Sequence, residues 1–303
     1  MVGITGDTTL YRDYHNTRFV VTGNGTELNL NGHTLSTDAD AQLVVLASGY
    51  TGHSVVNGKL EGAPYGIGVH IASCVAESDV PLLQAGGVAY EPTLYARCSH
   101  NPSVSGLEIS GFNDGIYVSP YVSGAVIMGN TLTDVDNVPV YLDTGSTGAV
   151  VSNNTFANNG WRGADSSFAR KRGHIAVDAS YGNTISGNTF TDSTYKWALF
   201  GGSANPSNYP APMIELYRNC GEGNSDWATY PVLPRVHGAD TNTISGNTFN
   251  GTGLAMWFEY REHNNICTPV IYPDKSEGNS AYGNNFAPGV EHARDDGANN
   301  AHD

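Results

Sequence analysis

The chain has 303 residues, of which 39% are hydrophobic and 14% charged, and its formal net charge is −15. This charge disfavours nucleic acids and anionic membranes as partners, because their phosphates would be repelled. No stretch approaches the roughly 18 apolar residues that a membrane-spanning helix needs. The first ten residues lack the basic and apolar segments of an export signal, so we expect that any such signal has been removed.

The chain opens with segments that predict the first coil of a solenoid. Residues 1–36 are expected to form a cap and a first coil, with 11–19 covering the end. Apolar residues alternate with Asn and Gly at 27–35 and again at 54–60, which is the period of a strand with one buried face. Because no linker run divides the chain, we expect one domain, with coils over 37–290.

A second series of short segments alternates in the same way and predicts a parallel sheet. The segments are 115–119, 139–143, 174–178, 214–217 and 256–259. The inward residues would be Ile116, Val118, Val140, Leu142, Ile175, Val177, Ile214, Leu216, Met256 and Phe258. The outward residues would be Tyr117, Tyr141, Asp143, Asp178, Glu215, Tyr217, Trp257 and Glu259. That outward face has more aromatic and acidic side chains than solubility requires, so we expect it to carry a function.

A short phrase recurs five times between these segments, at 128–132, 152–156, 186–190, 245–249 and 282–286. Its central asparagine returns after 24, 34, 59 and 37 residues, so the shortest interval is about one coil and the longer ones carry insertions. Asn tolerates left-handed turns and can hydrogen-bond along a solenoid, while the Leu or Phe that ends each phrase would stack inside. The predicted fold is an all-β, single-domain right-handed parallel β-helix with loop insertions.

Four cysteines, Cys74, Cys98, Cys220 and Cys267, fit no metal-binding spacing. Their even number in a lysine-poor chain indicates two disulfides and an extracellular location. Three pairings are possible; we favour Cys74 with Cys98 and Cys220 with Cys267, and buried free thiols are the alternative. Insertions are expected at 75–97 and 221–240, and the acidic segment 291–303 is expected to be a flexible tail.

Positive charge is concentrated in one part of this acidic chain. Eight of the 14 basic residues lie between 162 and 261: Arg162, Arg170, Lys171, Arg172, Lys196, Arg218, Arg235 and Arg261. They could form surface ion pairs, which contribute little to stability. Alternatively, the arginines would bind the carboxylates of a polyanion, with Tyr117, Tyr141, Tyr217 and Trp257 stacking on sugar rings.

Two reactions on a polysaccharide suit these residues. Hydrolysis needs two carboxylates across the scissile bond, for which Asp143, Asp178, Glu215 and Glu259 are candidates, although no tandem Asp pair is present. β-Elimination from a uronic acid needs a group that neutralises the carboxylate, a base for the C5 proton and an acid for the O4 oxygen. The segments 171–181 and 215–218 contain all these side-chain types.

The run at 214–222, the run at 238–249 and the later Cys267 resemble bacterial β-helix proteins that include the family 31 polysaccharide lyases acting on alginate. The resemblance covers about residues 100–290. It implies a catalytic Tyr at Tyr181 and places Arg218 where those lyases have a catalytic Lys. Because Arg has a pKa above about 12 and is a poor base, either Tyr181 or His174 takes the proton while Arg218 holds the carboxylate, or the substrate differs, or activity is lost.

We therefore predict a secreted, monomeric lyase that cleaves an alginate-like polymer without a metal or other cofactor. The catalytic residues would be Tyr181, Arg218 and His174. The substrate-binding residues would be Lys171, Arg172, Asp178, Glu215, Tyr217, Arg235, Trp257, Glu259, Arg261 and Tyr141. A C5-epimerase and a non-catalytic glycan-binding solenoid are the alternatives. Each catalytic candidate also has a purely structural interpretation. Tyr181 would be a turn residue, Arg218 would form an ion pair with Glu215 or Glu222, and His174 would bond to a neighbouring turn.

Overall fold

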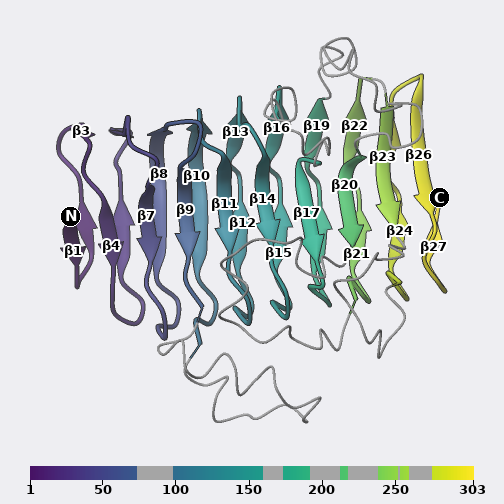
Figure 1. The fold of residues 1–303 in the computed structure, drawn as a ribbon, viewed down its shortest axis with the longest axis horizontal. Helices are drawn as coiled ribbons and strands as arrows, with labels where there is room; N and C mark the ends of the chain where they lie inside the picture. The colour runs from purple at the N-terminus through teal and green to yellow at the C-terminus, as the bar shows by residue number, and fades with distance from the viewer. Residues whose placement is uncertain (74–97, 160–172, 192–211, 218–237, 252, 259–274) are drawn as a thin grey trace.

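The computed structural model describes residues 1–73, 98–159, 173–191, 212–217, 238–251, 253–258 and 275–303. Every element in these ranges is a strand, and Figure 1 shows the strands stacked in chain order from one end of the molecule to the other. No helix in the described ranges is long and apolar enough to cross a membrane.

One sheet, here called sheet A, contains one strand from each coil, and all its neighbouring strands are parallel. In spatial order its ten strands are β1 (Val2–Ile4), β4 (Phe19–Val21), β7 (Gln42–Leu46), β9 (Ile67–Ile71), β11 (Asp114–Val118), β14 (Val138–Leu142), β17 (Ile175–Asp178), β20 (Pro212–Tyr217), β23 (Gly253–Phe258) and β26 (Val290–Asp295). Sheet order follows chain order, as stacked coils require.

The remaining strands form two parallel strips that share β8 (Ser54–Glu61) and β10 (Ser103–Ser110), here together called sheet B. The first strip adds β2 (Thr8–Thr9), β5 (Glu27–Asn29), β12 (Val126–Met128), β15 (Val150–Ser152), β18 (Thr184–Ser186), β21 (Thr243–Ser245), β24 (Ser280–Tyr282) and β27 (Ala301–His302). The second adds β3 (Tyr14–His15), β6 (Thr34–Ser36), β13 (Thr131–Thr133), β16 (Thr155–Ala157), β19 (Thr189–Thr191), β22 (Thr248–Asn250) and β25 (Asn285–Phe286). The predicted parallel β-helix is confirmed.

The interior is filled by residues stacked in register from coil to coil. All ten predicted inward residues of sheet A are fully buried. In the second strip of sheet B, Phe156, Phe190, Phe249 and Phe286 stack nearly parallel, with ring centroids 5.0 to 5.3 Å apart. The predicted stacking of the last residue of each phrase is therefore confirmed, and offset aromatic stacks of this kind add to the burial of the rings.

The recurring phrase forms the bend between the two strips of sheet B. Its second residue is Gly or Asn with φ between 55° and 67° in all five copies, a left-handed conformation that these residues accept most readily. The next residue, the central Asn, is buried in the first four copies and bonds to its counterpart in the following coil. The predicted left-handed turn and the predicted ladder thus fall on two adjacent residues.

Both ends of the chain take part in the solenoid, which corrects two predictions. Residues 2–15 already form a complete coil, so 11–19 are not a separate cap. At the other end, β26 pairs with β23 over five residues and β27 pairs with β24, so 291–303 are not a flexible tail. The acidic composition suggested disorder, but the backbone pairs with the preceding coil whatever its side chains.

Cys98 is fully buried at the start of the coil that contains β10 and is disulfide-bonded. Cys74, Cys220 and Cys267 lie outside the described residues, so both predicted pairings stay predictions. The predicted insertion at 75–97 also lies outside the described ranges, as does 221–237 of the insertion predicted at 221–240.

Candidate functional site

Polar and aromatic side chains form two rows on the outer face of sheet A. The strand register places His70, Tyr117, Tyr141, Ala176, Glu215 and Trp257 side by side from β9 to β23. Two residues further along each chain segment lie Ser119, Asp143, Asp178 and Tyr217, of which Asp178 and Tyr217 pair directly. The predicted outward residues that the structure describes, all but Glu259, therefore meet on one face, across neighbouring coils.

Hydrogen bonds connect the two rows diagonally from one coil to the next. His70 Nε2 lies 2.7 Å from Ser119 Oγ, the Tyr117 hydroxyl donates to Asp143, and the Tyr141 hydroxyl donates to Asp178 Oδ2 at 2.5 Å. The Tyr217 hydroxyl donates to the Tyr141 hydroxyl at 3.2 Å. We call Tyr117, Tyr141, Asp143, Asp178 and Tyr217 the outer network.

The outer network is shielded from solvent, which disagrees with the predicted stacking of Tyr141 and Tyr217 on sugar rings, since that needs exposed ring faces. Asp178 and Tyr217 are 1% exposed, and Tyr141 is 7% exposed. Tyr117 stacks on Tyr141 with ring centroids 5.3 Å apart, and these rings form an apolar cluster with Val138 that is separate from the main core. The side chains do point away from the solenoid interior, but they pack on each other instead of facing water.

Burial changes the titration of two groups on this face. Burial, followed by the negative charge of Asp143, raises the pKa of Tyr117 well above its ordinary value. Burial lowers the pKa of His70 to about 4, and the positive charge of Arg18 adds to this effect. At neutral pH Tyr117 is therefore a phenol that donates to Asp143, and His70 is an uncharged imidazole.

Glu215 and Trp257 continue the first row beyond the outer network. Glu215 is 3% exposed and pairs in register with Trp257. The Trp257 indole donates to Asp296 Oδ2 at 2.9 Å, and the Arg294 guanidinium lies 4.8 Å from the centre of its ring. Trp257 is 5% exposed, so its ring faces Arg294 and is not an open platform for a sugar.

Tyr181 lies in the turn that follows β17, where the chain passes from sheet A to sheet B. It is partly exposed and forms a parallel bridge with Thr147 of the preceding coil. The turn begins at Ala179, whose φ is 48° and whose N–H donates to the carbonyl of Tyr217. Tyr181 is therefore both a turn residue and a side chain with access to water, close in sequence to Asp178.

His174 lies in the interior, which corrects its predicted role in proton transfer. It is 4% exposed, and its ring lies 5.8 Å from the rings of both Phe156 and Phe190 in the inner stack. Its Nδ1 lies 3.2 Å from the side-chain nitrogen of Asn159, which follows β16. The alternative prediction, a bond to a neighbouring turn, agrees with this position.

The other predicted site residues lie outside the described ranges: Arg218, Lys171, Arg172, Arg235, Glu259 and Arg261. The distance from Tyr181 to Arg218, on which the predicted mechanism depends, is therefore not tested. Within the described ranges no group of three His, Cys, Asp or Glu side chains is arranged to hold a metal ion.

The sequence prediction missed His70 and Ser119, which extend the polar face to the coil before Tyr117. The signal was present, since residues 67–71 alternate like the later segments. It is hard to recognise because this strand lies far from the repeated phrases and has a single polar outward residue.

The sequence of residues 48–209 matches the family described as the right handed beta helix region. The chain belongs to this family. Membership gives the handedness of the solenoid and agrees with the parallel stacking of both sheets. No curated protein sequence matches the chain.

Solved structures show the same right-handed β-helix fold at low sequence identity. The enzymatically active domain of bacteriophage CBA120 tailspike protein 2 is 11% identical with a TM-score of 0.63, over 98% of this chain and 38% of the other. The surface protein and adhesin PfbA of Streptococcus pneumoniae is 12% identical with a TM-score of 0.51, over 94% and 69%. An alginate lyase from Paenibacillus sp. is 13% identical over 98% and 89%, with a TM-score of 0.40. The chain thus spans about two fifths of the tailspike chain, and the likenesses to the tailspike domain and the adhesin concern the fold alone.

Proposed function

We propose that the chain is an extracellular polysaccharide lyase that cleaves a uronate-containing, alginate-like polymer by β-elimination. The observation that carries the proposal is the outer network, which gathers carboxylates and phenols on four consecutive coils, with Tyr181 in the turn that follows Asp178. Ionisable groups held together by burial are typical of functional sites. The tailspike domain of similar fold, whose name describes it as enzymatically active, adds a precedent for catalysis on this fold.

The proposed reaction uses two residues that follow neighbouring strands of sheet A. Arg218, which stays charged at all working pH values, neutralises the carboxylate of the uronate. Tyr181, as phenolate, removes the C5 proton. The electron pair forms the C4–C5 double bond, the C4–O4 bond breaks, and the phenol of Tyr181 returns the proton to the departing O4 oxygen. His174 has no part in this scheme because it lies in the interior.

The outer network would act as a positioning layer in this scheme. The Tyr141–Asp178 bond fixes the end of β17 just before the turn that carries Tyr181. Asp178 also pairs in register with Tyr217, the residue before Arg218, so the network holds the two strand ends in a fixed relation. Lys171, Arg172, Arg235 and Arg261 would bind the flanking sugars.

The test is a lyase assay on a panel of acidic polysaccharides, read by the absorbance of unsaturated uronates. The wild type should raise this absorbance on at least one polymer. The rate of Tyr181→Phe should be about 10²-fold to 10⁴-fold lower, since that is the usual contribution of general acid–base groups. The matched control is Tyr282→Phe, an exposed tyrosine on the opposite sheet, which should keep full activity. No absorbance change on any polymer would refute the proposal.

Two other outcomes identify the alternatives. Exchange of the C5 proton without chain shortening would indicate a C5-epimerase. Tight glycan binding without turnover, unchanged in Tyr181→Phe, would indicate a non-catalytic binding solenoid. The product analysis by NMR and chain-length measurement separates these from cleavage.

Hydrolysis is a second candidate, favoured by one observation. Asp178 lies on β17 opposite Tyr217, and Glu215 lies two residues before Tyr217 on β20. Inverting hydrolases use two carboxyl groups about 6.5 to 9.5 Å apart, so two carboxylates on adjacent strands meet the first requirement of such a site. New reducing ends without unsaturated products, lost in both Asp178→Asn and Glu215→Gln, would favour this reaction.

A further inference from the structure

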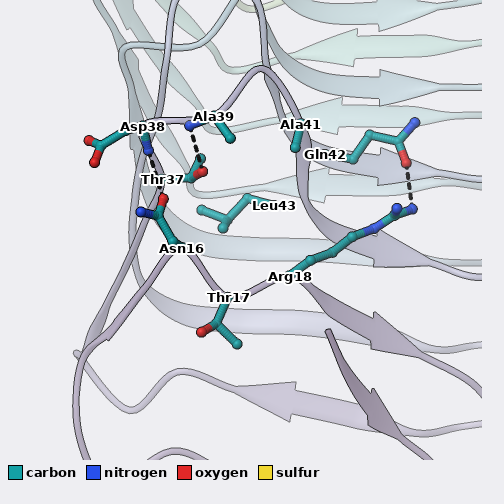
Figure 2. A pocket seen from close by; sticks show the side chains of 9 residues that line it. All are labelled: Asn16, Thr17, Arg18, Thr37, Asp38, Ala39, Ala41, Gln42 and Leu43. Carbon is teal, nitrogen blue, oxygen red and sulfur yellow. Dashed lines mark hydrogen bonds between the residues drawn. The ribbon is translucent and has the colours of Figure 1, made fainter.

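A small pocket lies at the N-terminal end of the solenoid, far from the outer network in sequence. It is formed by two stacked turns that lead from sheet B into sheet A, at 16–18 and 37–42, and its volume is about 290 Å³. Figure 2 shows Arg18 and Gln42 on one side of it, Asn16, Thr37 and Asp38 on the other, and Leu43 between them. This volume is at the low end of the roughly 300 to 1,000 Å³ of small-molecule sites, so the pocket suits one small ligand.

The positive side of the pocket is formed by Arg18, whose guanidinium is suited to bind a carboxylate. The Arg18 guanidinium donates to Gln42 Oε1 at 2.8 Å, which holds the side chain across two coils. Within the described ranges no acidic group lies within ion-pair distance of Arg18, and its other donors remain available. A planar guanidinium with free parallel donors binds carboxylates in a bidentate manner.

The opposite side of the pocket offers acceptors on a rigid turn. The Asp38 N–H donates to Asn16 Oδ1 at 2.9 Å, and the Ala39 N–H donates to Thr37 Oγ1 at 3.0 Å. These bonds fix the turn, while the exposed Asp38 carboxylate accepts a bond from His15 and has further lone pairs. A carboxylate at this position accepts hydrogen bonds from hydroxyl groups and repels multiply charged anions such as phosphate.

We propose that this pocket binds a single hexuronate unit, free or within a glycan chain. Arg18 would hold the sugar carboxylate, and Asp38 and Thr37 would bind its hydroxyl groups. The pocket has a cation on one side, Arg18, and on the other a carboxylate acceptor, Asp38, that also bonds to His15, and a ligand with a carboxylate and hydroxyl groups would match both sides. Because the overall charge is −15, a monovalent ligand is better suited to this protein than a polyphosphate. The site uses none of the residues assigned to cleavage, so this proposal is independent of the proposed function and can be tested separately.

The experiment titrates the intact protein with mannuronate, guluronate, glucuronate and galacturonate, using saturation-transfer NMR. These monomers contain no glycosidic bond, so the result does not depend on any lyase activity. We expect at least one uronate to bind, with glucose and inorganic phosphate each at least tenfold weaker. Failure of all four to bind, or equal binding of glucose, would overturn the proposal, and so would preferred binding of phosphate.

Variants locate the site. Arg18→Ala should weaken uronate binding at least tenfold, and Arg18→Lys, which keeps the charge and loses the planar fork, should weaken it at least threefold. The matched control is Arg12→Ala, which removes the same charge from an exposed arginine beside Tyr11 and Tyr14, outside the pocket. Thermal unfolding of each variant checks its folding. Equal losses in Arg12→Ala and Arg18→Ala would show a general charge effect and overturn the assignment.

Discussion

Two sets of buried polar side chains run along this solenoid, and they differ in how they repeat. Inside, Asn130, Asn154, Asn188, Asn247 and Asn284 form a ladder at the bend of sheet B, in which one residue type occupies each rung. Outside, successive strands of sheet A carry His, Tyr, Tyr, Ala, Glu and Trp. The first set is uniform, and the second changes at almost every coil.

We interpret the uniform asparagine ladder as structural and the varied outer row of sheet A as functional. A uniform ladder satisfies the same backbone groups at every bend, and a second ladder of Asn183, Asn242, Asn279 and Asn300 does so at the other corner. Because stacking alone would be satisfied by repetition, a row that changes residue type along one face has another constraint. We therefore expect changes in the ladder to affect stability and changes in the outer network to affect activity as well.

The largest effect is expected for Asn188→Ala in the middle of the ladder. Asn188 Oδ1 accepts from the backbone N–H and the side chain of Asn154, and its Nδ2 donates to the Val151 carbonyl and to Asn247. The substitution leaves several buried groups without partners, at about 1 to 3 kcal/mol each, so we expect a total loss of roughly 3 to 5 kcal/mol. Denaturant unfolding measures it.

The control for the ladder is Asn250→Ala, at the partly exposed end of β22. It should change the free energy of unfolding by less than about 0.5 kcal/mol. If both asparagine variants cost the same, the ladder has no special importance and the comparison above fails.

A smaller effect on stability is expected for Tyr141→Phe in the outer network. The variant removes the donor to the buried Asp178 carboxylate and should cost about 1 to 3 kcal/mol. If the outer network positions Tyr181, the lyase rate should also fall at substrate saturation while thermal unfolding still shows a folded protein. Tyr282→Phe is again the matched control. Unchanged activity in Tyr141→Phe would contradict the positioning role of the outer network and leave it a role in stability alone.

The pH dependence of stability tests the N-terminal end of the outer face. The pKa of His70 is about 4 in the folded protein, below the ordinary 6.5, so the unfolded state takes up a proton first as pH falls. Stability is full above pH 6.5 and decreases toward pH 4, by about 2 kcal/mol between pH 7 and pH 5 from this residue. His70→Gln should remove that part of the decrease, and the two unfolding curves should run parallel between pH 7 and 8. An unchanged slope in the variant would contradict the buried, neutral His70.

The smallest effect is expected for Arg294→Gln at the C-terminal end of sheet A. The guanidinium is partly exposed and lies over the Trp257 ring, a contact that contributes about 0.5 to 1 kcal/mol at such sites. Arg294→Lys should lose less, because it keeps a cation near the ring. Denaturant unfolding of the two variants and the wild type measures the difference.

Much of the fold followed from local patterns, and the site did so only in part. The repeated phrase identified the bend because a left-handed Gly or Asn followed by a ladder Asn is a local requirement at every coil. Alternation identified which side faces inward in five of the sheet A strands, β11, β14, β17, β20 and β23. The interior position of His174 was not predictable, because it depends on the Phe156 and Phe190 rings of sheet B, which reach it only when the coil closes.

The sequence by itself determined the period of the coils, the inward faces of the strands and the family of this protein. Each of these depends on nearby residues or on equivalent positions of successive coils. Only the tertiary structure decided that the outer tyrosines and aspartates bond to each other diagonally and are shielded from water. It also decided that the last residues pair with the preceding coil, and that Arg18 and Gln42 meet in one pocket. The physical reason is register: which side chains of adjacent coils meet depends on the length of every turn between them, which no local pattern fixes.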